Sequence, residues 1–401
     1  MALLPVDQAL ERILEGMHPL PAETVPLVEA VGRVLAAPLQ ARRSQPPFDA
    51  SAMDGYAVRA ADVASIPAIL RLVGEAAAGQ RYDGRLSAGE AVRIFTGAPV
   101  PPGADTILIQ ENAKRLDDGT IEATETVAPG WYIRRAGLDF RDGDRVLEAG
   151  RILDPAAISL AAAAGHPVVP VVGRPLIAVI ATGDELVRPD TDPGPDQIVA
   201  SNSFGIGALA QQDGAQILDL GIVPDDREAL AAGFRKALKA SADIVVTLGG
   251  ASVGERDLVR EVLTDEGMKL AFWKIAMRPG KPLMFGHADT ARVLGLPGNP
   301  VSSLVCSHLF LRPMIARLAG RSYIPDLRQA VLAESMKAND ERQDYVRASV
   351  TEGSEGLIAS PFRVQDSSML MTLAAANALI VREPHAPACE AGAPCQVLIL
   401  R

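Results

Sequence analysis

The segment TLGGASVGERDLV, residues 247–259, follows an apolar run and combines glycines, a serine and carboxylates. Gly249 and Gly250 let a ligand approach main-chain N–H groups closely, and successive N–H groups form an anion-binding nest. Ser252 adds a hydroxyl donor, and a carboxylate such as Asp257 beside the nest favours a divalent cation that bridges to a phosphate, as Mg²⁺ does. An ordinary strand-to-helix turn with exposed charges is the alternative, and spacing alone does not decide between the two.

The segment GLPGNPVSS places a turn directly before a predicted helix. Pro297 precedes a turn at Gly298 and Asn299, Pro300 suits the first helical position, and Ser302 lies in the first turn. The free N–H groups and hydroxyls at a helix N-terminus can bind a phosphate or another oxyanion. Taken alone, the segment is equally typical of a well-capped helix without a ligand.

The segment MRPGKP, residues 277–282, supplies positive charge to an otherwise acidic chain. Arg278 and Lys281 flank a Pro-Gly turn, and Lys274 lies just upstream. Arginine offers bidentate geometry to an oxyanion, whereas lysine offers a mobile point charge. We therefore expect this turn to bind an anionic substrate, although a solvated basic turn would have the same sequence.

A third group of polar residues lies in a region of short β-like runs. Asp54 precedes a glycine in SAMDGYAV, Thr96 precedes a glycine in RIFTGAPVPPGAD, and Asp139 follows two arginines in YIRRAGLDF. Each could belong to a surface loop. Their concentration in one small β domain predicts a lid that closes over the edge of a neighbouring sheet.

Several common enzyme signatures are missing from the sequence. It has no GxxxxGK[ST] segment, which excludes a P-loop NTPase. Gly205, Gly207 and Ala210 spell GxGxxA, but they lie inside a predicted helix rather than in the turn after a strand. The five histidines never occur at the spacing of metal ligands, which argues against a zinc hydrolase.

Composition excludes further classes of protein. The formal net charge of −10 argues against a general nucleic-acid binder, because phosphate contacts need clustered Lys and Arg. The cysteines at 306, 389 and 395 form no CxxC pair, which fits a reducing cytosol without structural zinc. The N-terminal segment is amphipathic without a basic signal region, and no apolar run reaches membrane-spanning length. We expect a soluble, cytoplasmic protein without a membrane partner.

The arrangement of apolar runs predicts the elements that position these residues. From about residue 174, apolar strands alternate with helices, which is typical of a doubly wound, mostly parallel sheet. Ligands bind at the carboxyl ends of the strands in such sheets. Those ends read ATGDEL, TLGGASVGERD and GLPGNPVSS, so we expect all three loops to form a single site.

The chain of 401 residues is too long for one core, and its composition changes along the sequence. We predict an α/β multidomain protein with a doubly wound α/β domain, a small β lid domain, a helical or mixed linker domain and a C-terminal β-barrel-like domain. The predicted bounds are 1–45 with 141–173 for the elongated linker domain, 46–140 for the lid, 174–321 for the α/β domain and 322–401 for the barrel. The first 20 or so residues are predicted to form a helix that packs on the α/β domain.

The ordered set of motifs resembles the molybdopterin molybdenumtransferase family, the bacterial relatives of the gephyrin E domain. The resemblance covers essentially the whole chain and rests on the segments PFDASAMDGYAVRAAD, IFTGAPVPPGADTILIQE, ATGDEL, SNS, TLGGASVGERD, KIAMRPGKPLMFG and GLPGNPVSS. It implies a reaction in which adenylated molybdopterin and molybdate react with Mg²⁺-dependent cleavage of the phosphoanhydride, release of AMP and transfer of molybdenum to the dithiolene.

The resemblance also implies an elongated homodimer with the site between subunits. The implied partners are the molybdopterin adenylyltransferase and acceptor molybdoenzymes. Two other functions remain open at this point. An adenylyltransferase that makes the adenylated pterin from ATP would share the GG loop but would not need residues 46–140. A non-catalytic scaffold could bind pterin or protein partners without turnover.

The resemblance carries family roles onto individual residues of this chain. Functionally important polar positions match Asp54, Thr96, Asp139, Glu185, Asp226, Asp257, Lys274 and Lys281. Asp225 is an equal rival of Asp226, and Arg278 stands where relatives often have Lys. In the C-terminal part, Arg347 and either Ser367 or Ser368 match a molybdate-contacting arginine and serine.

These matches suggest which residues bind the metal ion, the molybdate and the pterin. Glu185 and Asp257 would hold Mg²⁺ against the pyrophosphate. The molybdate dianion would be held by Lys281, Arg347 and Ser367. The pterin and phosphate would lie on Gly249, Gly250, Ser252 and the helix start at 298–303.

Overall fold

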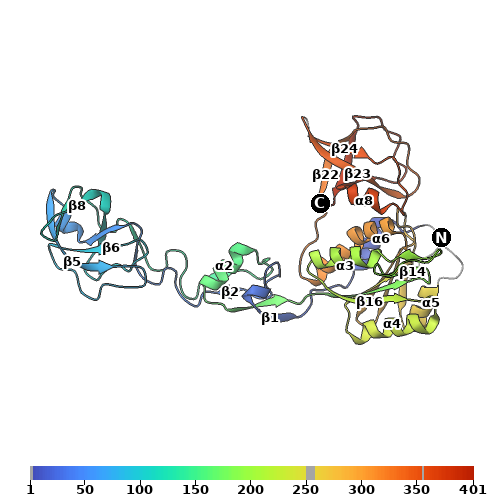
Figure 1. The fold of residues 1–401 in the computed structure, drawn as a ribbon, viewed down its shortest axis with the longest axis horizontal. Coiled ribbons are helices and arrows are strands. Elements are labelled where there is room, and N and C mark those ends of the chain that lie inside the picture. The colour runs from blue at the N-terminus through green and yellow to red at the C-terminus, as the bar shows by residue number, and fades with distance from the viewer. Residues whose placement is uncertain (1–2, 250–257, 355) are drawn as a thin grey trace. The chain divides into compact units, whose positions relative to one another are not determined.

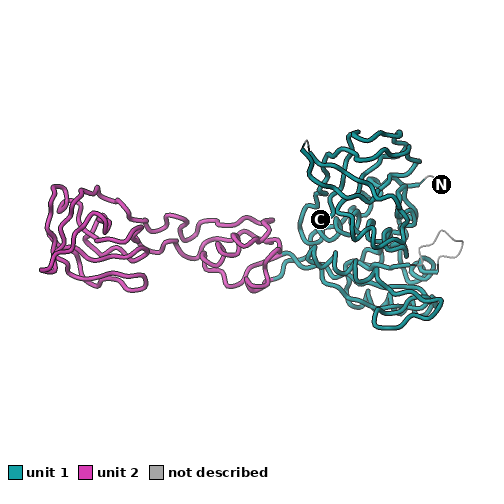
Figure 2. The backbone as a smooth tube through the Cα atoms, turned by 45° about the horizontal axis from the view of Figure 1, so that its top comes forward, with its two compact units in different colours: residues 1–23, 172–401 teal, residues 24–171 magenta. Residues whose placement is uncertain are grey.

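The computed structural model describes residues 3–249, 258–354 and 356–401. The chain divides into two compact units (Figure 2), which are described here one after the other. Unit 1 comprises residues 1–23 and 172–401, and unit 2 comprises residues 24–171. The predicted residues Gly250, Ser252 and Asp257 lie outside the described ranges.

Unit 1 is built on a mixed sheet with the strand order β16-β13-β17-β21-β20-β18. The strands β16, β13, β17 and β21 are parallel, whereas β20 runs antiparallel to β21 and the edge strand β18 runs antiparallel to β20. Their bounds are Leu176–Thr182 for β13, Gln216–Val223 for β16, Ile244–Leu248 for β17, Lys269–Trp273 for β18, Met284–Ala288 for β20 and Ala291–Leu296 for β21. A short parallel pair, β14 (Leu186–Val187) and β15 (Ile198–Val199), follows the first strand.

Helices cover both faces of this sheet, which explains why its central strands are apolar along their whole length. Ile177 and Val179 of β13 pack into one core, whereas the alternate residues Ala178 and Ile180 pack into the other. Figure 1 shows the two layers, with α3 (Asn202–Gln212) and α6 (Pro300–Cys306) on one side and α4 (Arg227–Lys239) and α5 (Leu258–Asp265) on the other. The predicted doubly wound architecture is confirmed.

The N-terminal helix α1 (Val6–Leu14) belongs to the first of these cores. Its Ala9 and Ile13 are completely buried against the layer that contains α6, η4 (Ser307–Leu311) and α7 (Arg312–Leu318). The segment that begins the chain therefore packs on the sheet formed by residues far along the sequence.

The C-terminal strands of unit 1 close into a barrel. The sheet runs β23-β24-β22-β26-β25, and β25 pairs with β23 again, so the first and last strands of this order are neighbours. The bounds are Leu327–Leu332 for β22, Gln343–Gly353 for β23, Gly356–Pro361 for β24, Ala378–Arg382 for β25 and Pro394–Ile399 for β26, with α8 at Leu370–Ala375. The short strand β19 (Met277–Arg278) pairs in parallel with Gln343 and Asp344, which ties the basic turn to the barrel. The expected barrel-like C-terminal domain is confirmed.

Unit 2 contains a β sheet and a smaller mixed core. The sheet has the order β7-β4-β6-β5-β9-β8, with β4 at Gly55–Val58, β5 at Ala68–Ala76, β6 at Glu90–Ile94, β7 at Thr106–Ile109, β8 at Ala113–Arg115 and β9 at Thr120–Ala123. Short 3₁₀ turns lie at Leu27–Glu29, Ala60–Val63 and Gln110–Asn112. The second core surrounds α2 (Pro155–Ala163) and the strand pairs β1 (Ala22–Pro26) with β12 (Val168–Val172) and β2 (Leu39–Gln40) with β11 (Arg145–Leu147). The pair β3 (Ala50–Ser51) and β10 (Ile133–Arg134) positions the loop that contains Asp54.

Candidate active site

The carboxyl ends of β13, β17 and β21 meet the basic turn and one segment of the barrel around a pocket of about 630 Å³. This pocket is called the junction pocket below. Its lining includes many of the residues predicted from sequence, namely Glu185, Gly249, Arg278, Lys281, Pro297, Gly298, Asn299, Ser302 and Ser367. The expectation that three distant loops form one site is therefore met within unit 1. A neighbouring pocket of about 440 Å³ shares Glu185, Gly249 and Asn299 and has more apolar walls.

Gly249 occupies the point of closest approach between two strand ends. Its φ of +92° is in the left-handed region, and an added Cβ would lie 2.6 Å from the carbonyl oxygen of Thr182. Both observations require glycine. The first glycine of the GG loop is therefore needed by the backbone itself, in addition to any ligand.

Three carboxylates gather at the ends of β13 and β16. Asp184 accepts a hydrogen bond from the main-chain N–H of Asp225 at 3.0 Å. Burial, with the negative charges of Asp184 and Glu185, raises the pKa of Asp225 above its ordinary value. Among the described residues, no group of three or more acidic, histidine or cysteine side chains is arranged to hold a metal ion by itself. A cation here would need oxygen ligands from a substrate or water as well.

The adjacent Asp226, which the sequence left as an equal alternative to Asp225, begins a helix. It is the N-cap of α4, and its Oδ1 accepts the N–H of Ala229 at 2.9 Å. Asp225, rather than Asp226, lines the junction pocket. Asp226 follows the ordinary preference for aspartate at this helix position.

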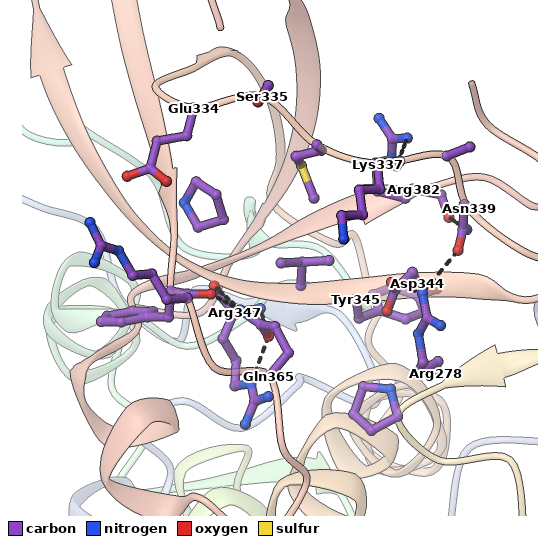
Figure 3. A pocket seen from close by; sticks show the side chains of 17 residues that line it. Arg278, Glu334, Ser335, Lys337, Asn339, Asp344, Tyr345, Arg347, Gln365 and Arg382 are labelled. Atoms are coloured by element: carbon purple, nitrogen blue, oxygen red, sulfur yellow. Dashed lines mark hydrogen bonds and ion pairs between the residues drawn. The ribbon is translucent and has the colours of Figure 1, made fainter. Parts of the chain in front are cut away.

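The basic turn presents one cation to the pocket and uses another to hold the barrel. Arg278 binds the Asp340 carboxylate at 3.2 Å. It also binds the Asn339 side chain at 3.1 Å and makes a further ion pair with Asp344 (Figure 3). The hydrogen bond that Arg278 donates to Asp344 is the main reason that the pKa of Arg278 is raised. Lys281 lines the junction pocket, and no carboxylate of the described chain pairs with its ammonium group.

Lys274, which was predicted to contribute to catalysis, does not line the junction pocket. Its φ is +77°, and its Nζ lies 3.8 Å from the centroid of the Trp273 ring. A cation over an indole face is a favourable arrangement in its own right. The structure thus gives Lys274 an aromatic partner outside the junction pocket, and its part in catalysis stays a prediction.

The start of α6 is joined to the barrel segment through Ser367. The Asn299 Nδ2 donates to Ser367 Oγ at 2.8 Å, and the N–H of Val301 donates to the Ser367 carbonyl at 3.1 Å. Ser368 instead donates to Asp366 Oδ1 at 2.6 Å. Of the two serines left open by the sequence, Ser367 is the one that lines the junction pocket.

Arg347 is buried in the barrel strand β23, with 1% of its surface exposed. It lines a second pocket of about 590 Å³, shown in Figure 3 and called the barrel pocket below. Burial lowers the pKa of Arg347. Gln365 lines both pockets and hydrogen-bonds to Arg347, so it connects the predicted arginine to the junction pocket.

The remaining predicted residues lie in unit 2. Asp54 Oδ1 accepts hydrogen bonds from the Thr96 N–H at 2.7 Å and from the Thr96 hydroxyl at 2.8 Å. These bonds lower the pKa of Asp54. Asp139 is exposed on the same unit. The pairing of Asp54 with Thr96 is brought about by the fold, since the two residues lie on different turns.

Sequence reasoning missed four polar side chains of the junction pocket, namely Thr182, Arg342, Gln365 and Asp366. Thr182 ends a strand already identified and precedes the Gly-Asp turn, so its position was a usable signal. Arg342, Gln365 and Asp366 come from the barrel, and the closed pairing of β23 brings them to the pocket.

None of the helices in the described ranges combines the length and apolar character needed to cross a bilayer.

Comparison with known proteins places these features in a family. Residues 4–165 match the MoeA N-terminal region (domain I and II), residues 178–317 a probable molybdopterin binding domain, and residues 329–400 the MoeA C-terminal region (domain IV). The chain is 36% identical to a molybdopterin molybdenumtransferase of Haemophilus influenzae over 97% of both chains, and 39% identical to one of a Nostoc species over 82% of this chain and 77% of the relative.

A solved structure is similar to this chain over its full length. The crystal structure of a molybdopterin biosynthesis MoeA protein from Pyrococcus horikosii aligns over the full length of both chains with a TM-score of 0.85 and 29% identity. The three matched regions follow one another along this chain, and the second and third coincide with the α/β sheet and the barrel of unit 1. The chain belongs to the molybdopterin molybdenumtransferase family.

Proposed function

We propose that the enzyme inserts molybdenum from molybdate into adenylated molybdopterin, with Mg²⁺-dependent cleavage of the phosphoanhydride and release of AMP. One observation carries the proposal. The junction pocket places the carboxylates of Glu185 and Asp225 in the same space as the ammonium group of Lys281. A pocket with both signs of charge suits a reaction between a metal-bound pyrophosphate and a separate oxyanion. The three-region match to the family supports this substrate pair.

The acidic side of the pocket fits a magnesium ion. The raised pKa of Asp225 reflects repulsion from Asp184 and Glu185 as well as burial, and a cation would relieve that repulsion. Mg²⁺ commonly binds through one or two carboxylates with water and substrate phosphates, which matches the absence of a complete ligand set in the described chain. Glu185 and Asp225 would hold the ion, together with Asp257 from outside the described ranges. When bound, Mg²⁺ would neutralise the pyrophosphate charge and orient the phosphorus that is attacked.

The basic side of the pocket fits molybdate. Lys281 is available as a point charge, Ser367 Oγ can donate to an oxyanion oxygen, and Arg347 is held next to Gln365 at the wall. Two anions repel each other, so these cations would both bind molybdate and keep it near the pterin. The start of α6, with Gly249, Gly298 and Ser302, would lie against the pterin and its phosphate.

The family resemblance extends the proposal to unit 2 and to the assembly. We propose that the enzyme acts as a homodimer, and that Asp54, Thr96 and Asp139 take part in the same reaction. The ionised Asp54 would act as a fixed hydrogen-bond acceptor, because Thr96 already donates to it twice. The adenylyltransferase and acceptor molybdoenzymes are the protein partners that this place in cofactor synthesis requires.

The direct test is AMP release from adenylated molybdopterin by the purified protein, with and without molybdate and Mg²⁺. Release that needs both would support the proposal. Tight binding of the adenylated pterin without release would favour a scaffold. Formation of the adenylated pterin from ATP and molybdopterin would favour an adenylyltransferase.

A further inference from the structure

Arg347 is a charged side chain that the fold removes from water. It lies on β23 between Val346 and Ala348, with 1% of its surface exposed. Burying a guanidinium group is costly unless hydrogen bonds and nearby charge offset the loss of hydration. The groups that contact Arg347 therefore stabilise its buried position in the wall of the barrel pocket and fix its orientation.

A single side chain makes most of these contacts. Gln365 Oε1 accepts hydrogen bonds from the main-chain N–H and from the Nε–H of Arg347, each at 3.0 Å. Gln365 Nε2 donates to the Arg347 carbonyl at 3.0 Å and to the Phe362 carbonyl at 2.7 Å. The amide thus pairs with the backbone of Arg347 as a neighbouring strand would, and the same oxygen fixes the guanidinium group (Figure 3).

The two terminal nitrogens of Arg347, Nη1 and Nη2, differ in their hydrogen bonding. Nη1 donates to the Asp366 carbonyl at 2.7 Å, whereas Nη2 has no hydrogen-bond acceptor among the described residues. The guanidinium group is therefore held at two of its nitrogens and keeps one amino group for another acceptor. A side chain held in this way loses little conformational freedom when it binds an anion.

We propose that Gln365 is a positioning residue for oxyanion binding, and that it acts through Arg347. The inference rests on the proposed function, in which Arg347 holds molybdate. Gln365 lines both the barrel pocket and the junction pocket, so its amide lies at the wall between Arg347 and the space that Lys281 faces. Loss of the amide would free the guanidinium group to adopt other rotamers and would weaken molybdate binding, while the groups around the pyrophosphate would be unchanged.

A second side-chain amide that pairs with β23 provides a control that separates a merely structural role of Gln365 from a role in positioning Arg347. Asn377 Oδ1 accepts the N–H of Val350 at 2.7 Å, and its Nδ2 donates to the Val350 carbonyl at 2.8 Å. Asn377 therefore makes the same amide-to-backbone pairing with β23, but within the described ranges its side-chain hydrogen bonds go to Val350 alone, and it lines neither the barrel pocket nor the junction pocket. Asn377→Leu removes this pairing with little change in volume, as Gln365→Met does for Gln365.

The experiment compares wild type, Q365M, N377L, R347M and R347M/Q365M in steady-state AMP release at varied molybdate, with melting temperatures alongside. We expect Q365M to raise the KM for molybdate about tenfold, as loss of a hydrogen bond to a charged group predicts, with kcat little changed. N377L should melt earlier, as Q365M does, but should keep the wild-type KM. The double variant should have the same KM as R347M, because Gln365 has nothing to position once Arg347 is gone.

Direct molybdate binding by calorimetry gives an independent readout. Weaker binding by Q365M but not by N377L would support the inference. A raised KM in R347M with an unchanged KM in Q365M would overturn it, as would equal KM increases in Q365M and N377L. If the wild-type enzyme neither binds molybdate nor releases AMP, the proposed function fails and the inference fails with it. Normal KM for molybdate in R347M would instead reject only the assignment of Arg347 and its positioning residue.

Discussion

Asp225 and Asp226 are sequence neighbours with separate tasks, because Asp226 Oδ1 caps α4 by accepting the Ala229 N–H at 2.9 Å while Asp225 lines the junction pocket with Glu185. An aspartate at an N-cap satisfies a donor that the helix leaves without a partner. Within the described residues Asp225 satisfies no such helix donor, and its pKa is raised by burial and by the carboxylates of Asp184 and Glu185. Substitution of each aspartate in turn should therefore separate an effect on stability from an effect on the reaction.

We predict that Asp226→Ala destabilises the protein by about 1 kcal/mol, as loss of an N-cap usually does, and leaves AMP release at saturating substrates near wild type. Asp225→Asn should have the opposite pattern, with a normal melting temperature and greatly slowed AMP release. Chemical denaturation and steady-state kinetics on the two variants check both halves. A catalytic defect in D226A without loss of stability would contradict the assignment.

The raised pKa of Asp225 makes a prediction about pH. A carboxyl group whose folded pKa is raised binds its proton more tightly in the folded protein, so ionisation of Asp225 opposes folding and protonation competes with metal binding. We expect the Mg²⁺ concentration for half-maximal AMP release to increase as the pH falls toward this raised pKa. Saturating Mg²⁺ should move the acidic limb of the pH profile to lower pH. An acidic limb that does not respond to Mg²⁺ would place the titrating group elsewhere.

Lys281 should behave as a ligand-binding cation without a structural role. Its ammonium group has no ion-pair partner in the described part of the chain, so Lys281→Met should not lower the melting temperature. Removal of a charged hydrogen-bond donor predicts a rise of about ten- to a hundredfold in the KM for molybdate. Lys281→Arg, which keeps the charge, should recover part of this loss. A KM that is unchanged in K281M, measured by AMP release at varied molybdate, would exclude Lys281 from the oxyanion site.

Arg278 illustrates a cation with a mainly structural role. It binds Asp340, Asp344 and Asn339, so Arg278→Lys cannot satisfy all three acceptors. Because these groups are partly exposed, we expect a loss of about 1 kcal/mol in the free energy of unfolding, which shrinks at high salt. Turnover should change less than stability, since the positive charge is kept. Denaturation curves at low and high salt test this, and equal losses at both would argue against an electrostatic cause.

Much of the fold could be predicted because its signals are local. The continuous apolar runs of β13 and β17 indicated a sheet covered on both faces, and Ile177 and Ala178 do face opposite cores. The antiparallel strands β18 and β20 were not identified, because short mixed runs such as MFGHA have no clear period. A barrel-like C-terminal domain was expected, but the strand pairing that closes it could not be read, since it depends on which strands β23 pairs with.

Residues of the site could be predicted where they belong to one loop with a recognisable motif. They were missed where the fold brings distant segments together. Glu185, Gly249 and Lys281 follow strands or turns with clear signatures, and all of them line the junction pocket. Lys274 lies in the same basic segment, but its left-handed backbone turns it onto Trp273. Gln365 has no motif of its own, and only the folded barrel shows that its amide holds Arg347.

The last prediction concerns Thr96 and the charge state of Asp54. Its N–H and hydroxyl both donate to Asp54, so the folded pKa of Asp54 lies below the unfolded value of 3.8. The stabilisation from this pair is therefore complete above the unfolded pKa and is lost as the pH falls through the lower folded pKa. Thr96→Val removes the hydroxyl donor but keeps the main-chain N–H, so the pKa of Asp54 should rise part of the way toward 3.8.

Carbon-13 NMR titration of the Asp54 carboxyl group measures this shift, and Thr96→Ser should restore the wild-type value because it keeps the hydroxyl. If Asp54 must remain an acceptor during turnover, T96V should also slow AMP release most strongly at acidic pH, where a raised pKa leaves more of Asp54 protonated. An unchanged pKa in T96V would show that the main-chain N–H alone holds the carboxylate ionised. In that case the side chain of Thr96 would have to act on the substrate directly, and T96V would slow turnover equally at all pH values.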